Sequence, residues 1–463
     1  MKSFVFATLI FFGTLFFASC KKEIITSADA QLGISKDTLR FDTVFTTTGS
    51  VTQSFKILND NDQKIVLSKI KLMGGSASAY KMNVNGAPAS ELNNVEISSN
   101  DSIYVFVTIT VNLTAATLPF IISDSILVNY NGISRFVQLE AFGQNAVFIR
   151  NGIISGNVNF INTLPYVILG GLQITNTGSL SINAGTKIYC HANAPILVEG
   201  KMVTNGTKTQ PVIFAGDRLD DPYNNFPGAW PGIYFRETSL DNVLRFTNIK
   251  NAYQAVSVQQ PSVNANPKLL MQQCIIDNAF DAGILGSNTT ITAENTVISN
   301  CGKNVNLEYG GTYLFTHCTI AAYSNNYVTH KKPVVYLSDA NSTNQTAALN
   351  AVFRNSVIYG DAGFTDTEIQ TNKSGNNPFS VNIDHCLYRA AVDPQNAVFN
   401  ICIKNRDPLF DSIDNVHRYY DFRNTKNAIA PGTDKGILTP LLKDLDDKNR
   451  NVGLPDLGAY EKQ

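Results

Sequence analysis

The chain has 463 residues, of which 44% are apolar and 10% aromatic, so it is long enough for two or three domains and apolar enough to bury their cores. Only 16% of the residues are charged, and the formal net charge is −1. This near-neutral balance, with no basic cluster longer than a pair such as Lys331 and Lys332, argues against nucleic acid as a partner.

The first twenty residues predict an export signal with a lipid anchor. A positively charged start precedes the apolar run Phe4–Phe17, which is too short to cross a bilayer comfortably. The run ends in Phe-Ala-Ser-Cys20, which resembles the bacterial lipobox, where the cysteine is acylated and becomes the new N-terminus. The alternative is an ordinary signal peptide with an incidental cysteine. We expect residues 1–20 to be a lipoprotein signal peptide with lipobox Cys20, and residues 21–36 to be a tether.

Residues 37–143 predict a separate β domain. Short alternating apolar runs are separated by turn residues, and Asn131-Gly132 between two such runs is a strong hairpin signal. About seven strands in about a hundred residues, without a helical period, predict an immunoglobulin-like β-sandwich. The Cys-Trp-Cys core of antibody domains is absent, so this expectation concerns architecture only. We expect the domain to act as a spacer or an assembly module.

Residues 144–435 contain a repeat. In each of six segments, a small or thiol residue is followed two places on by Ile or Tyr and preceded three places earlier by an apolar residue. Side chains two apart on a strand share a face, so this pair points inward, and the three-residue offset implies a bend. Segments that recur every 22 to 38 residues predict a right-handed parallel β-helix, a solenoid. The segments are 243–249, 270–276, 292–298, 314–320, 352–358 and 382–388.

Nine segments spread over nearly the whole mature chain match one known group. They are 41–44, 83–86, 165–168, 184–189, 216–220, 227–233, 310–320, 444–450 and 455–461, the last containing Asp456-Leu-Gly-Ala-Tyr-Glu461. In these segments the chain resembles the right-handed parallel β-helix lipoproteins of Bacteroidetes type. The resemblance implies an all-β fold with the β-helix preceded by the immunoglobulin-like sandwich, a C-terminal cap motif over 436–463, and a lipid anchor in the outer membrane, but no settled activity. In the run directly after Cys20 only Glu23 is acidic, so the periplasmic and the surface face both stay open.

One excursion from the repeat, residues 217–232, gathers acids, an arginine and three aromatic residues. The aromatic side chains, among them the only tryptophan of the chain, predict a platform on which sugar rings stack beside the carboxylates. The alternative is a loop that folds its aromatic side chains back onto the solenoid. The candidate binding residues here are Asp217, Arg218, Asp220, Asp221, Tyr223, Phe226 and Trp230.

A second candidate lies in the outward column two places before the small residue of each segment. If the coils of the solenoid stack in sequence order, Arg354 and Asp384 are neighbours in this column. They then form either a surface ion pair or part of a binding or catalytic site. Enzymes that cleave polysaccharides need close carboxylates, or a calcium cluster with a basic residue. No two carboxylates occupy adjacent rungs of this column, so no catalytic residue is assigned.

Metal-binding patterns are weak throughout. Histidines stand beside cysteines, but adjacent strand residues point to opposite faces and cannot share one metal. We expect His317 and His385, with Asn355 between them, to form an exterior ladder. The run Asp444–Asn449 suggests a calcium loop, but Lys448 stands where an oxygen ligand is needed, so we expect a structural turn, with a calcium site as the alternative.

The inward column also contains three cysteines, Cys274, Cys318 and Cys386. Each is separated from the next by a whole rung, about 10 Å, which is beyond the reach of a disulfide. We therefore expect free, buried thiols.

Two functions remain open from the sequence. The first is a non-catalytic envelope lipoprotein whose solenoid binds a glycan or a partner protein. The second is a polysaccharide lyase or glycoside hydrolase on the same scaffold.

Overall fold

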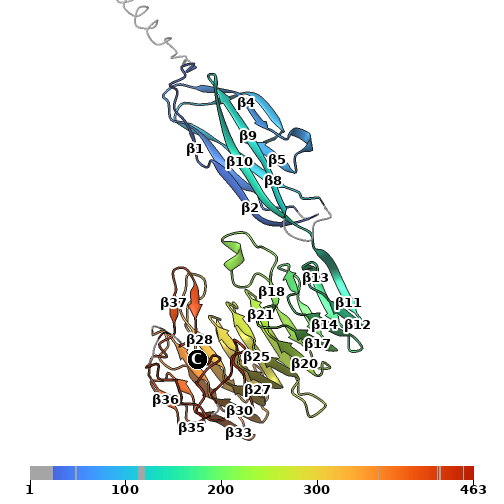
Figure 1. The fold of residues 1–463 in the computed structure, drawn as a ribbon, viewed down its shortest axis with the longest axis vertical. Helices are drawn as coiled ribbons and strands as arrows, with labels where there is room; N and C mark the ends of the chain where they lie inside the picture. The colour runs from blue at the N-terminus through green and yellow to red at the C-terminus, as the bar shows by residue number, and fades with distance from the viewer. Residues whose placement is uncertain are drawn as a thin grey trace, which may run out of the picture. The chain divides into compact units, whose positions relative to one another are not determined.

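The structure is a computed structural model that describes residues 24–46, 49–112, 120–362, 364–424, 426, 429–451 and 453–462. Within these residues the protein is all-β and contains no α-helix, and the chain divides into two compact units between Asn145 and Ala146 (Figure 1). No helix in this described part is long and apolar enough to cross a membrane. The predicted signal peptide and Cys20 lie outside the described residues.

The first unit consists of two five-stranded sheets, with strand orders β1-β3-β8-β5-β6 and β2-β10-β9-β4-β7. All the strand pairs are antiparallel except β2 with β10. The strands are β1 (Leu32–Ile34), β2 (Thr38–Phe45), β3 (Gln53–Asn59), β4 (Ile65–Leu72), β5 (Tyr80–Val84), β6 (Ala87–Pro88), β7 (Glu91–Ile97), β8 (Asp101–Ile109), β9 (Phe120–Tyr130) and β10 (Ile133–Gln144).

Alternation along the strands builds the core between these two sheets. In β8, Ile103, Val105, Val107 and Ile109 are buried, while the residues between them face outward. The predicted hairpin is confirmed, because β9 and β10 pair across Asn131 and Gly132, with φ of 45° and 82°. Positive φ at both residues is what a two-residue hairpin turn of right-handed twist requires, and Asn-Gly adopts it at little cost.

The predicted tether over 21–36 is wrong for part of its length. Leu32–Ile34 forms β1, which pairs with β3, and Leu32 is buried in the core of the first unit. The hydrogen bonds of an edge strand and one buried leucine hold the chain here, where composition alone suggested a free segment.

The second unit contains one parallel sheet of 26 strands, β11 to β36, in which each strand pairs with a strand of the next coil. This winding is consistent with a β-helix. The first strands are β11 (Val147–Ile154), β12 (Asn157–Phe160), β13 (Tyr166–Ile174), β14 (Ser179–Asn183), β15 (Lys187–Cys190), β16 (Ile196–Val198), β17 (Lys201–Asn205), β18 (Val212–Gly216), β19 (Ile233–Phe235), β20 (Asn242–Arg245), β21 (Thr247–Lys250), β22 (Gln254–Gln259) and β23 (Leu269–Gln272). The later ones are β24 (Ile275–Asp277), β25 (Ala282–Glu294), β26 (Val297–Ser299), β27 (Lys303–Thr316), β28 (Thr319–Ala322), β29 (Val335–Ser338), β30 (Leu349–Arg354), β31 (Val357–Gly360), β32 (Ile369–Asn372), β33 (Phe379–Asp384), β34 (Leu387–Tyr388), β35 (Val398–Asn400) and β36 (Ile403–Lys404).

The strand register confirms the predicted repeat. The outward column pairs in the expected order, from Arg245 through Thr316 to Asp384, across six coils. The predicted bend is one residue in the left-handed region, immediately before each small residue. Its φ runs from 43° at Phe246 to 52° at His317. Asn and His tolerate this conformation better than most side chains, which explains their recurrence in this column.

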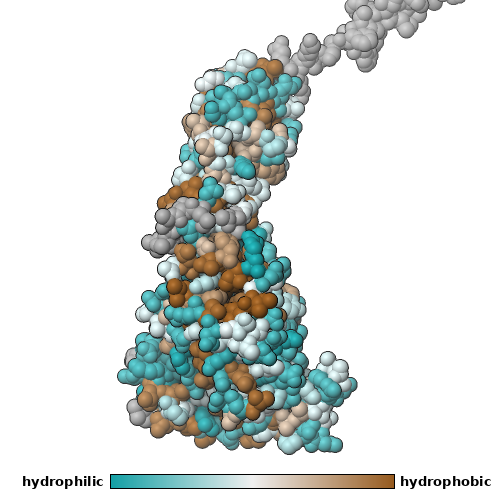
Figure 2. Space-filling view, turned by 90° about the vertical axis from the view of Figure 1, so that its right-hand side faces the viewer, coloured by the Kyte–Doolittle hydropathy of each residue, from teal (hydrophilic) through white to brown (hydrophobic). Residues whose placement is uncertain are grey.

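The core of the second unit is a continuous stack of inward side chains, among them Phe214, Trp230 and the small-residue column. Cys274, Cys318 and Cys386 are buried and unbridged, as predicted. Hydrophobic side chains also reach the surface, in patches bordered by hydrophilic ones (Figure 2).

The parallel strands end at Lys404, before the predicted limit of residue 435. An antiparallel hairpin of β37 (Ser412–Asp414) and β38 (Tyr419–Asp421) follows. We expected residues 436–463 to cap the solenoid. Residues 436–451 and 453–462 instead lie along its flank, bonded to Asn295, Thr319 and Asn355 of three successive coils. We name this segment the strap.

Candidate functional site: an aromatic ledge on the second unit

Five aromatic side chains from three parts of the second unit lie on one flank of the coils, and we name them the aromatic ledge. They are Tyr223, Phe226, Tyr253, Phe280 and Tyr327. Tyr223, Tyr253 and Phe280 are 42%, 45% and 55% exposed, although aromatic rings of this size are usually buried in a core.

The rings of the ledge form two groups joined by the 217–232 loop. The centroid of Phe226 lies 5.1 Å from that of Tyr223 and 5.0 Å from that of Tyr327. Tyr253 and Phe280 stack with centroids 5.6 Å apart and planes inclined by 24°. Gly228, in the same loop, lies so close that an added β-carbon would be 3.5 Å from the Cβ of Phe280. The loop thus carries one group of rings and is in contact with the other.

Buried asparagines fix the loop to the coils. Asn251 and Asn278 occupy equivalent corners of successive coils, with φ of 60° and 59°. Their Nδ2 atoms donate to the carbonyl oxygens of Asn224 and Asn225, at 2.7 and 3.0 Å. Because Asn225 is part of the 3₁₀ turn Tyr223–Asn225, these bonds hold the Tyr223 backbone in place before any ligand arrives.

Two arginines lie against the rings of the ledge. Arg218 places its guanidinium 3.9 Å from the centroid of Tyr223 and binds both oxygens of Asp220, at 2.7 and 2.8 Å. The bonds to Asp220 raise the pKa of Arg218. Arg418 lies 4.9 Å from the centroid of Tyr327 and donates from Nη1 to the carbonyl of Asn225. The ledge therefore combines exposed aromatic faces with cationic hydrogen-bond donors at its edge.

The structure assigns different places to the predicted loop residues. Tyr223 and Phe226 belong to the ledge, and Asp221 is exposed beside them. Trp230 cannot serve as a stacking platform, because it is fully buried against Phe214 and donates from Nε1 to the carbonyl of Lys250. Asp217 accepts a hydrogen bond from His191 rather than from the loop, at 2.7 Å.

The sequence did not reveal four residues of this site, which are Tyr253, Phe280, Tyr327 and Arg418. One signal for the first two exists, since Asn251-Ala-Tyr253 and Asn278-Ala-Phe280 repeat an Asn-Ala-aromatic triplet one coil apart. Tyr327 and Arg418 lie in irregular segments far along the chain, and no local pattern marks them.

A separate polar group contains the other two predicted residues. Arg354 and Asp384 are neighbours in register, and Arg354 Nε donates to Asp384 Oδ2 at 3.0 Å. His385 Nδ1 lies 2.8 Å from the other carboxylate oxygen. Burial raises the pKa of Asp384, but the bonds to His385 and Arg354 outweigh it, so the pKa stays below its ordinary value. The carboxylate thus orients a histidine and an arginine at once.

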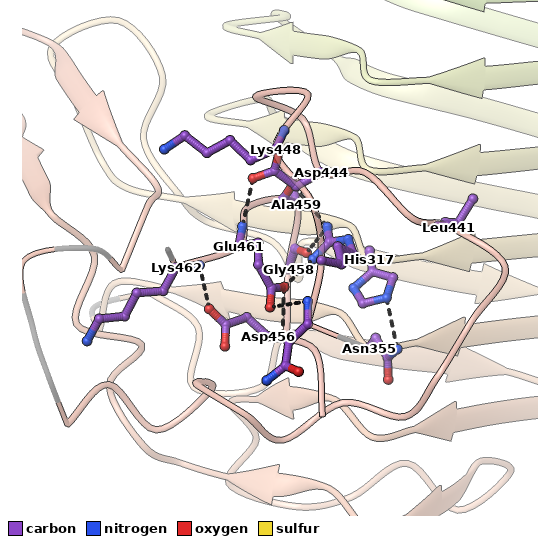
Figure 3. A network of polar contacts seen from close by, with 12 residues as sticks. His317, Asn355, Leu441, Asp444, Lys448, Asp456, Gly458, Ala459, Glu461 and Lys462 are labelled. Atoms are coloured by element: carbon purple, nitrogen blue, oxygen red, sulfur yellow. Dashed lines mark hydrogen bonds and ion pairs between the residues drawn. The ribbon is translucent and has the colours of Figure 1, made fainter. Parts of the chain in front are cut away.

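The predicted exterior ladder is wrong for His317 and Asn355. Both His317 and Asn355 are fully buried, because the strap covers them (Figure 3). His317 Nε2 lies 3.0 Å from Asn355 Nδ2, which also donates to the carbonyl of Ile437. Only a segment distant in sequence produces this burial, so the repeat pattern alone could not reveal it.

The acidic run 444–449 does not fit calcium. Asp444 accepts backbone N–H bonds from Lys448 and Glu461, one at each carboxylate oxygen (Figure 3). Asp446 binds Arg423 through both oxygens and also contacts Lys208. The oxygens that a calcium ion requires are thus already used by protein donors. Among the residues that the structure describes, no group of three or more His, Cys, Asp or Glu could hold a metal ion.

Comparisons with known proteins add little beyond the fold. No protein-family profile matches the chain, and no curated protein matches it. A family 123 glycoside hydrolase from Clostridium perfringens is similar at 13% identity over 26% of this chain and 30% of that one, with a TM-score of 0.19. The catalytic unit of a family 87 α-1,3-glucanase from Streptomyces thermodiastaticus strain HF3-3 is similar at 8% identity over 76% of this chain and 88% of that one, with a TM-score of 0.22. Likenesses this weak support no inference about activity.

Proposed function

We propose that this protein is a lipid-anchored protein of a bacterial outer membrane, similar to β-helix lipoproteins of Bacteroidetes type, that binds a glycan without cleaving it. In this proposal the first unit is an immunoglobulin-like spacer and the second is a right-handed parallel β-helix. The lipobox pattern ending at Cys20 supports the anchor. The parallel coils support the solenoid.

The observation that carries glycan binding is the aromatic ledge. Its three exposed rings present flat apolar faces, which match the C–H faces of sugar rings, and the two arginines at its edge supply N–H donors for hydroxyl groups. The asparagine bonds fix the loop in advance, so little conformational entropy is lost on binding.

A glycan array with the purified chain tests the proposal. We expect binding that falls by about tenfold or more in Tyr253→Ala and in Phe280→Ala. Phe136→Ala, which removes a 48% exposed ring from β10 of the first unit, is the matched control and should bind normally. Unchanged binding in both ledge variants would exclude the ledge as the site.

The alternative, cleavage of the polysaccharide, rests on the carboxylate of Asp384 with His385 and Arg354. A product assay on every glycan that binds separates the two functions. Binding without new reducing ends or unsaturated products supports the non-catalytic protein. Products that disappear in both His385→Ala and Arg354→Ala, in variants that still fold, would establish the enzyme.

The anchor has its own test. Cys20→Ala should move the protein from the membrane fraction to the soluble fraction of the cell, because no acyl chain can then be attached. A variant that stays in the membrane fraction would refute the lipobox.

A further inference from the structure

The outer face of the sheet β1-β3-β8-β5-β6 carries two exposed rings at its centre. Tyr104 and Phe106 lie on β8, the middle strand, and point away from the core with 40% and 39% exposure. Their centroids are 5.6 Å apart and their planes differ by only 12°. Two nearly parallel rings, stacked on each other and left in water on a regular strand, form an exposed apolar surface of the kind that marks binding sites.

A hollow of about 450 Å³ adjoins this pair. Phe106, Met82, Gly86 and Pro88 form its apolar part. Polar side chains come from Thr52, Lys81, Asn83 and Thr108. The volume lies within the range of small-ligand sites, which combine an apolar wall with a few polar groups. In register, Phe106 lies opposite Asn83 of β5, so the amide is placed at the edge of the ring.

Two lysines give the face a charge. Lys56 lies opposite Tyr104, with Nζ 4.8 Å from the ring centroid, and Lys81 lies opposite Thr108. Neither lysine has a carboxylate within 4.0 Å among the residues the structure describes. The described residues of this face therefore present positive charge that none of their own carboxylates neutralises at this distance.

The other sheet of the same unit shows the contrast. Its lysines are neutralised in place, since Lys69 and Lys71 both bind Glu91, at 2.9 and 3.0 Å, and Lys64 binds Glu96 at 2.8 Å. Lysines left unpaired beside exposed aromatic rings are complementary to a ligand that is both flat and negatively charged.

We propose that this face of the first unit binds an anionic saccharide, with one sugar ring on Phe106, the next on Tyr104, and the carboxylate or sulfate groups between Lys56 and Lys81. The site is separate from the aromatic ledge and does not depend on it. A neutral glycan would use the rings but leave both lysines without a partner, so the site favours acidic chains.

Calorimetric titration of the purified full chain tests the proposal with three probes of similar length: oligogalacturonate, dextran sulfate and neutral dextran. We expect both acidic probes to bind and neutral dextran to bind at least about tenfold more weakly. Phe106→Ala, and separately Lys56→Gln combined with Lys81→Gln, should lower the affinity for the acidic probes by about tenfold or more. Added salt should weaken binding by the wild type, because the attraction is partly ionic.

Two controls make the outcome decisive. Phe136→Ala removes a 48% exposed ring from the opposite sheet and should leave binding unchanged, and Tyr253→Ala, in the ledge, is measured alongside to show whether the acidic probes also bind there. Thermal unfolding of each variant confirms that it folds. The proposal is overturned if neither acidic probe binds, if neutral dextran binds equally well, if Phe106→Ala binds as the wild type, or if only Tyr253→Ala abolishes binding.

Discussion

Arg450 and Glu461 form an ion pair that is almost completely removed from water, with Nη1 3.0 Å from Oε2 and side-chain exposures of 2% and 3%. Arg450 also donates to Asn295 Oδ1 from Nε and Nη2, at 3.2 and 2.6 Å, which ties the strap to a coil. Burial lowers the pKa of Arg450 and raises that of Glu461. Each charge is therefore tolerated only because the other is present.

Replacing Arg450 should detach the strap. Arg450→Met leaves the Glu461 carboxylate buried without its cationic partner, a change that typically costs about 3–5 kcal/mol. We expect faster proteolytic cleavage within the strap and a lower free energy of unfolding in denaturant titrations. Lys448→Met, at an exposed position in the same strap, is the control. Equal protease resistance in Arg450→Met and the wild type would show that the ion pair does not hold the strap.

His317 should make the strap sensitive to acid. Burial lowers its pKa well below the ordinary 6.5, and the charge of Arg450 adds to this. The unfolded chain therefore binds a proton at this histidine near pH 6.5, whereas the folded protein does not. Above pH 6.5 His317 costs no stability, and below pH 6.5 it progressively lowers the free energy of unfolding. His317→Asn keeps a side chain suited to the positive φ and cannot titrate.

Hydrogen exchange of the strap between pH 7.5 and pH 5 measures this effect. After correction for the intrinsic exchange rate, wild-type protection should fall toward pH 5, whereas protection in His317→Asn should depend less on pH. The same decline in both proteins would assign the acid sensitivity to other groups.

A second histidine should act in the opposite direction. His330 is buried between two carboxylates, with Nδ1 2.8 Å from Asp361 and Nε2 3.0 Å from Glu368. Burial alone would lower its pKa, but the two acids outweigh burial and raise the pKa to about 9. This stabilisation is fully present below pH 6.5 and is lost as the pH rises through about 9.

We call His330 with its two partners, Asp361 and Glu368, the histidine clamp, and His330→Gln tests it. We expect the loop 323–334 of the wild type to become accessible to protease above pH 9, and the loop of His330→Gln to be accessible already at pH 7. His417→Gln, which alters an exposed histidine paired with Asp414, is the control and should behave as the wild type. A wild-type loop that resists cleavage equally at pH 7 and pH 10 would contradict the clamp.

The thiols should differ in reactivity. Burial raises the pKa of Cys274 and Cys318 to about 12, so both are protonated and inaccessible at neutral pH. Cys402, in the last coil, is only partly buried. Alkylation of the native protein followed by mass spectrometry should label Cys402 first, and Cys274 and Cys318 only after unfolding. Early labelling of Cys274 would contradict the register of its coil.

The sequence by itself determined the coils of the second unit. Inward and outward positions, the bend before each small residue and the pairing of Arg354 with Asp384 all follow from a pattern that repeats within each coil. Such a pattern is readable because each coil buries its own side chains against the next, so local spacing fixes which face a residue occupies.

Only the tertiary structure decided what covers the outside of the coils. Whether His317 is exposed, whether Trp230 forms a platform and which rings join Tyr223 depend on the strap, the 217–232 loop and the segments carrying Tyr327 and Arg418. These segments do not repeat, and they meet the coils through contacts between residues up to 238 positions apart, as between Lys208 and Asp446. The free energy of such contacts depends on shape and burial at the meeting point, which no spacing within one segment encodes.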